Sequence, residues 1–95
     1  MIVRALLLAA AFPLPSPATD AALAKAPREI GVFLERRAEC EHWGGEEPYD
    51  KARLAEITRA VRKLRCDRLE AEQRALLRKY AGRPAVVRLL EAETD

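Results

Sequence analysis

Apolar side chains recur every three or four positions along most of the chain after residue 26. This spacing places them on one face of a helix, and it predicts helices over 27–41, 51–65, 68–81 and from Pro84 to about residue 90. The four apolar faces consist of Ile30, Phe33, Leu34 and Ala38; Leu54, Ile57, Val61 and Leu64; Leu69, Leu76, Leu77 and Tyr80; and Val86, Val87, Leu89 and Leu90. No stretch alternates as a half-buried strand would. The predicted fold class is therefore all-α, a small bundle of three to four short helices with one disulfide.

Turn-forming residues separate the first two helices. Pro27 suits the first position of the first helix, because its missing N–H would be unpaired there anyway. Gly44 and Gly45 stop a helix, and Pro48 prevents its early return. We therefore expect a loop over 42–49, followed by Asp50 as the N-cap of the second helix.

Similar signals mark the later helix ends. Asp67 is expected to cap the helix over 68–81, with Glu70 as its partner in a capping box. Gly82 is expected as the C-cap glycine of this helix. Pro84 suits the first position of the last helix.

The chain begins with features of a secretory signal peptide. Arg4 precedes an apolar run over residues 5–12, and prolines and small residues follow. The run is shorter than the roughly 20 residues needed to span a bilayer. The alternatives are an uncleaved N-terminal membrane anchor or a misassigned start.

The segment Ala22-Leu23-Ala24 fits the small-x-small pattern of a cleavage site and predicts a cut before Lys25, with Ser16-Pro17-Ala18 as a second candidate. We therefore expect residues 1–24 to be a cleaved signal peptide and residues 25–95 to form a single small helical domain. The expected location is the periplasm or the exterior of the cell, with no transmembrane span after processing.

Two cysteines, Cys40 and Cys66, lie in the predicted mature chain. The simplest use of such a pair in an exported chain is a disulfide. Its Cα atoms must lie within about 7 Å of each other, whereas the helix over 51–65 is about 22 Å long. Either the loop over 42–49 first travels along the bundle, so that the second helix returns toward Cys40, or the second helix crosses the first steeply.

The formal net charge is +2. Removal of the predicted signal peptide takes away Arg4 and Asp20, one charge of each sign, so the mature chain keeps a net charge of +2. This charge is too small to imply a nucleic-acid partner.

Rare residue types gather between Cys40 and Asp50, where the only histidine lies. His42, Glu46 and Glu47 are weak candidates for a metal site. A zinc site needs about four well-placed ligands, and the spacing of Cys40 and His42 is not a standard zinc pattern. We expect no metal or other cofactor.

Residues for nucleophilic catalysis are scarce. No serine remains after cleavage before Lys25, and a disulfide leaves no free thiol. His42 with Glu46 or Glu47 resembles a base and its orienting carboxylate, but a small helical bundle offers little concavity for a substrate. We expect no enzymatic activity, and His42 is expected to bond a backbone carbonyl at the end of the first helix.

Trp43 and Tyr49 have two interpretations. As structural residues, they cover the open end of the bundle with their polar tips in water. As functional residues, they join His42 in contacting a partner, since tryptophan and tyrosine dominate interface hot spots. The structural interpretation is favoured, because a chain with few aromatic residues needs them in its core.

Basic residues are in excess along the second helix and the corner after it. An exported protein can use such a face to bind lipid headgroups, another anionic envelope component or an acidic protein. The favoured alternative is a solvated face, as most charge runs are. The candidates for partner contact are Arg59, Arg62 and Lys63; Lys51, Arg53, Arg65 and Arg68 complete the excess, against Glu56 and Asp67.

The run Arg36-Arg37-x-x-Cys40-x-His42-Trp43, together with Arg65-Cys66 and Lys79-Tyr80 ahead of Pro84, resembles a group of small exported bacterial proteins with two cysteines and no assigned function. The resemblance covers most of the mature chain. It implies a small periplasmic helical protein and transfers no catalytic or binding residues. Small disulfide-bonded lysozyme inhibitors are a looser comparison, but this chain lacks their multiple cysteines.

The sequence as a whole predicts a small exported helical protein that acts as a binding or structural accessory protein, without catalytic activity. Its partner is expected to be another envelope protein or an anionic envelope component. The alternative is a metal- or anion-binding protein that uses the loop over 42–50 and the basic second helix.

Overall fold

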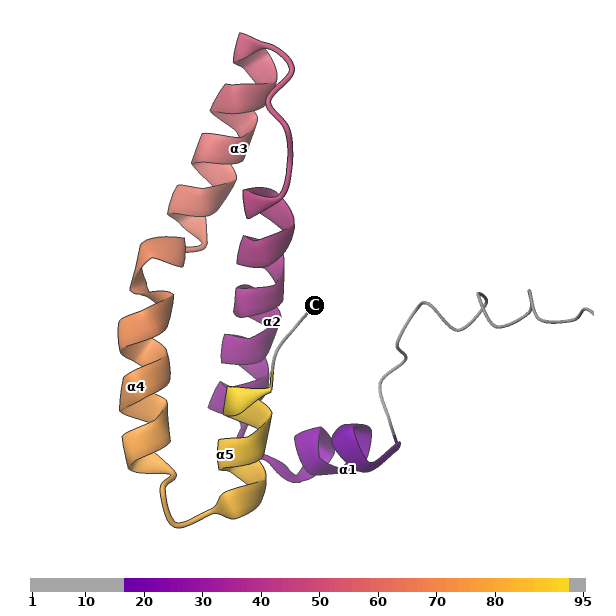
Figure 1. Ribbon diagram of the computed structural model, residues 1–95, viewed down its shortest axis with the longest axis vertical. Helices are drawn as coiled ribbons and strands as arrows, with labels where there is room; N and C mark the ends of the chain where they lie inside the picture. Colours follow the sequence, from indigo (N-terminus) through magenta and orange to yellow (C-terminus); the bar gives the residue numbers. More distant parts are fainter. Residues whose placement is uncertain (1–16, 93–95) are drawn as a thin grey trace, which may run out of the picture.

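The computed structural model describes the backbone of residues 17–92 and the side chains of residues 20–92. Its elements are α1 (Pro17–Lys25), α2 (Arg28–Gly44), α3 (Lys51–Lys63), the short 3₁₀ helix η2 (Cys66–Arg68), α4 (Leu69–Lys79) and α5 (Pro84–Glu91). Figure 1 shows α2 as a long rod, with α3 and α4 following one another along its side and α5 beside its N-terminal half. The all-α prediction is confirmed, since no strand occurs between residues 17 and 92.

The buried core lies at one end of this arrangement. It consists of Ile30 and Phe33 from α2 and Val86, Leu89 and Leu90 from α5. Side chains of α4 pack against it, but α3 contributes no buried residue. We call residues 28–39 of α2, together with α4 and α5, the body, and residues 40–64 the arm.

The arm turns back on itself and is closed by a disulfide. Cys40 and Cys66 are bonded, with their Cα atoms 5.6 Å apart. The loop over 45–50 runs on past the end of α2 before α3 begins, so α3 returns antiparallel to α2 and ends near Cys40 (Figure 1). The disulfide and the travelling loop are therefore both confirmed.

The predicted end of the first helix is wrong by three residues. α2 continues through His42 and Trp43 to Gly44, so both side chains stand on a helix instead of a loop. Gly45 alone ends the helix, where its N–H donates to the carbonyl oxygens of Glu41 and His42. Pro27 precedes the helix as its N-cap residue.

The predicted cap of α3 is confirmed, because Asp50 Oδ1 accepts from the backbone N–H of Arg53 at 2.8 Å. The predicted capping box of Asp67 and Glu70 is wrong. The chain winds directly from η2 into α4, and backbone carbonyls of Arg65 and Cys66 accept from the first N–H groups, so no side-chain cap is formed.

The end of α4 also differs from the prediction. Its last turn closes at Tyr80, whose N–H donates to the Leu76 carbonyl, and Gly82 lies in the turn beyond it. Gly82 has no positive φ, so it is not the expected C-cap glycine. Pro84 opens α5 as expected.

The helix α1, except its last residue Lys25, falls inside the segment predicted to be cleaved. It lies against α5, and Ala22 and Ala26 pack on the core. A cut before Lys25 would remove Ala22 from this contact, whereas a cut after Ala18 would keep it. Signal-peptide cleavage stays a prediction, and its apolar run over 5–12 lies outside the described residues. No helix between residues 17 and 92 is long and apolar enough to cross a membrane.

Candidate interaction surfaces

The joint between body and arm is held by Arg36. Its Nε donates to the Leu64 carbonyl at 2.6 Å, and its Nη1 bonds Glu72 Oε1 at 2.8 Å. The guanidinium of Arg36 therefore caps the C-terminus of α3, where unpaired carbonyl groups carry partial negative charge. The same group forms an ion pair with Glu72 of α4. Its hydrogen bond is the main cause that lowers the pKa of Glu72.

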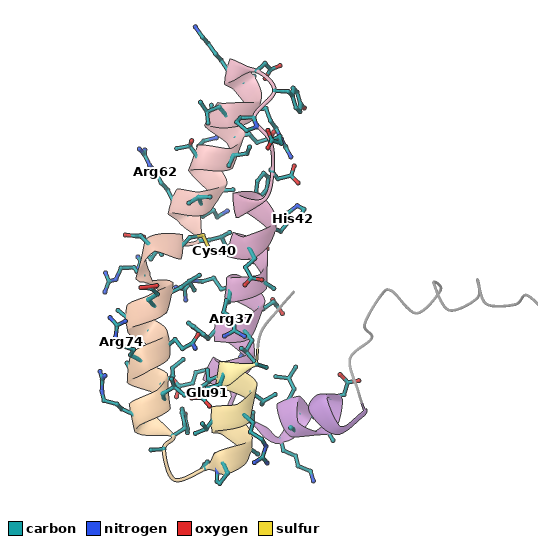
Figure 2. All side chains as sticks on the ribbon, in the orientation of Figure 1. Arg37, Cys40, His42, Arg62, Arg74 and Glu91 are labelled. Carbon is teal, nitrogen blue, oxygen red and sulfur yellow. A yellow bond between two sulfur atoms is a disulfide. The ribbon has the colours of Figure 1, made fainter. Side chains whose placement is uncertain are left out.

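Arg37, the next residue, caps the C-terminus of α5. It donates to Gln73 Oε1 at 3.0 Å and to the carbonyls of Leu90 and Ala92 at 2.9 and 3.1 Å. Figure 2 shows Arg37 on α2, just beyond the end of α5. Both arginines lie off the apolar stripe of the sequence, which gave no sign of these bonds.

Replacement of Arg36 by methionine should lower the free energy of unfolding by about 2 kcal/mol. Hydrogen bonds to a charged group contribute roughly 1.5–3 kcal/mol, and partial exposure of the Arg36 side chain (22%) reduces the value. Urea unfolding followed by circular dichroism measures the change. Arg74→Met is the matched control, because Arg74 is exposed and should cost less than about 0.5 kcal/mol. Equal losses in both variants would contradict the role of Arg36.

The far end of the arm is organised by Arg53. Its guanidinium carbon lies 5.2 Å from the centroid of the Trp43 ring. It also bonds Glu46 from the loop and Glu56 at 2.7 Å. These carboxylates, Glu56 first, raise the pKa of Arg53. Trp43 is thus half-buried, with Arg53 over its ring, and Arg53 does not belong to the solvated basic face.

The candidate metal ligands do not form a cluster. His42 Nε2 lies 3.8 Å from Glu46 Oε2, but Glu46 is already bonded by Arg53, and Glu47 is exposed. The His42 ring packs edge-on against Trp43 and points away from α3 (Figure 2). Between residues 20 and 92, no three side chains of histidine, cysteine, aspartate or glutamate are placed to hold a metal ion.

The tip of the arm is open. Tyr49 is 80% exposed and Leu54 is 50% exposed. The prediction that Tyr49 covers the end of the bundle is therefore wrong, since the loop carries its ring past the end of α2 into solvent. The loop on both sides of Tyr49 is anchored, because Asp50 caps α3 and Glu46 is bonded to Arg53.

The predicted basic residues Arg59, Arg62 and Lys63 are all exposed. They lie on the side of α3 opposite Ile57 and Val61, which face α2. Figure 2 shows Arg62 of α3 and Arg74 of α4 on the outer side of these two helices, and Arg74 also borders a groove that Arg37 and Glu41 of α2 line. The structure thus adds α4 to a face that the sequence confined to α3 and the corner.

A groove of about 540 Å³ between α2 and α4 was not expected from the sequence. Its apolar lining is Val32, Phe33, Ala75 and Leu76. Val32 is 56% exposed because it lies off the stripe that faces the core. The pattern alone gave no sign that α2 and α4 stand far enough apart to leave this space.

Glu29 also lines the groove. Its Oε2 accepts from Lys79 Nζ at 2.6 Å and from the hydroxyl of Tyr80. The hydrogen bond from Lys79, followed by that from Tyr80, lowers the pKa of Glu29. In return, the carboxylate raises the pKa of Lys79 and of Tyr80. The contact ties the start of α2 to the end of α4.

Comparisons with protein-family models, curated proteins and solved structures gave no match to this chain. Function must therefore be argued from the surfaces themselves: the tip of the arm, the basic face of α3 and α4, and the groove between α2 and α4.

Proposed function

We propose that this protein is an exported, non-catalytic binding protein whose arm contacts another envelope protein through its tip. The observation that carries the proposal is the exposure of Tyr49 and Leu54, 80% and 50%, at the end of an arm that buries no residue of α3. Tyrosine is enriched among the residues that anchor protein interfaces, and Leu54 adds exposed apolar surface beside it.

The construction of the arm supports this function. The disulfide and Arg36 hold the base of α3 against α2. Asp50 and the pair of Glu46 with Arg53 order the loop on both sides of Tyr49. A loop whose backbone is already ordered loses less conformational entropy on binding, which favours affinity.

The proposal is tested by placing a photocrosslinking amino acid at position 49 in the exported protein in its native cell. A discrete adduct with one envelope protein is expected from position 49 and none from position 85, since Ala85 is exposed on α5 at the other end of the molecule. With the purified partner, Tyr49→Ala should raise the Kd at least tenfold, as for an interface anchor. The proposal fails if positions 49 and 85 give the same adducts, or if Tyr49→Ala leaves the Kd unchanged.

A further inference from the structure

A row of unpaired cations follows the outer side of α3 and α4. None of them takes part in a salt bridge within the described residues. We call this surface the outer face; it consists of Arg59, Arg62, Lys63, Arg74 and Arg78, with the exposed Ala52, Ala55 and Ala71 on the same faces of the two helices.

Helical geometry accounts for this row. Positions three and four apart share one face of a helix, so Arg59, Arg62 and Lys63 lie together on α3, as Arg74 and Arg78 do on α4. Figure 1 shows α3 and α4 running end to end along the same side of α2, which joins the two groups into one face. At the corner between them, the exposed charges of Asp67 and Glu70 are offset by Arg65 and Arg68.

The opposite side of the molecule carries two acidic residues of α2 beside one basic residue, Arg28. Glu35 and Glu39 lie one turn apart on the exposed face of α2, away from α3 and α4. The small net charge of +2 therefore conceals an asymmetry between the two sides. Such an asymmetry orients a protein at a charged surface, because one side is attracted and the other is repelled.

We propose that the outer face docks on the anionic surface of a lipid bilayer, through the phosphates of its headgroups. This surface is separate from the tip of the arm and goes beyond the binding proposed there. A bilayer fits the extended row of cations, which contains no aromatic residue to stack on nucleic-acid bases. Alanines offer no large apolar group for insertion, so the contact is electrostatic and stays at headgroup level.

Docking in this way gives the molecule one orientation. The axes of α3 and α4 lie along the membrane, and Glu35 and Glu39 on α2 point away from it. Each lysine or arginine near an anionic bilayer contributes attraction that corresponds to about a fivefold gain in binding. Five such residues on one face, even without full additivity, are enough for measurable binding at low salt.

Binding to vesicles of phosphatidylcholine with and without phosphatidylglycerol tests the proposal. We expect the mature protein to sediment with the anionic vesicles only, and to be released by salt as the charges are screened. The triple variant Arg59→Gln, Arg62→Gln and Lys63→Gln should bind on the order of 100-fold more weakly. The control variant Arg28→Gln, Arg83→Gln and Arg88→Gln removes the same charge from exposed positions elsewhere and should bind far more tightly than the first.

Three results would overturn the proposal. The first is that the protein does not bind anionic vesicles at low salt. The second is that the two triple variants lose the same amount of affinity for the vesicles. The third is that the protein binds soluble polyphosphate or an oligonucleotide more tightly than vesicles with the same phosphate concentration. Tyr49→Ala should bind vesicles as the unmodified protein does, and the outer-face variant should keep the crosslink from position 49. Loss of one activity is thereby distinguished from loss of the other.

Discussion

Replacement of both cysteines, Cys40→Ala with Cys66→Ala, should lower the free energy of unfolding by about 3.5 kcal/mol. The bond joins residues 26 positions apart. Closure of a loop of this length restricts the unfolded chain, and the chain-entropy estimate is about 3.5 kcal/mol. Small domains commonly have only 5–15 kcal/mol of total stability, so the loss is a large part of it.

The structure indicates which part of the molecule loses stability when the disulfide is removed. No residue of α3 is buried, so only the half-buried side chains of Ile57, Val61 and Leu64 offer apolar contact to replace the bond. The contacts that remain at its base are the hydrogen bonds of Arg36 to the end of α3. We therefore expect the arm to separate from α2 first, while the body keeps its helices.

Urea unfolding measured by circular dichroism gives the loss, and hydrogen exchange shows its location. The matched control is the unmodified protein with a reducing agent, which should lose the same stability, whereas the cysteine-free variant should be insensitive to the reagent. Amide protection should fall over 51–64 and be retained over 28–39. Uniform loss of protection would contradict the separation into arm and body.

Leu90→Ala should have an effect of the same size at the other end of the molecule, about 3–4 kcal/mol. Leu90 is 0% exposed and packs with Ile30 and Phe33. Loss of a fully buried leucine removes its transfer free energy and leaves a cavity in the core. The core has few buried residues, so neighbouring side chains have little freedom to fill the space.

Leu54→Ala is the matched control, because the same side chain is removed from a position that is 50% exposed. Its cost should be less than about 1 kcal/mol, as for other exposed sites. Thermal or urea unfolding of both variants measures the difference. If Leu54→Ala cost as much as Leu90→Ala, the tip of the arm would be covered in solution, contrary to the open surface on which the proposed function rests.

Local sequence patterns predicted much of the fold. The apolar spacing predicted α2, α3, α4 and α5, and Asp50 and Pro84 correctly marked two helix starts. The expected disulfide also left two arrangements, a loop that runs on before α3 returns or a steep crossing of α2 by α3, because a helix has a fixed rise per residue. The structure has the first of them. Helix ends were less certain where several local signals compete, as at Gly44 and Gly45.

The surface features were harder to predict from the sequence. The sequence singled out Trp43 and Tyr49 together, yet one lies under Arg53 and the other stands in solvent. It also grouped Arg53 with Arg59 and Arg62, although Arg53 is bonded to two carboxylates. Residue type and spacing cannot separate these cases, because the partner of each side chain comes from another turn or another helix.

The sequence by itself determined the all-α class, the principal helices and the pair of cysteines, because periodicity and capping act over a few neighbouring residues. Only the tertiary structure decided that Arg36 and Arg37 turn inward, to partners 28 to 55 positions away. Only it joined Arg74 to Arg62 on one outer face and left Tyr49 open at the tip. These features depend on which helices lie side by side and on the space between them, and no local pattern encodes that arrangement.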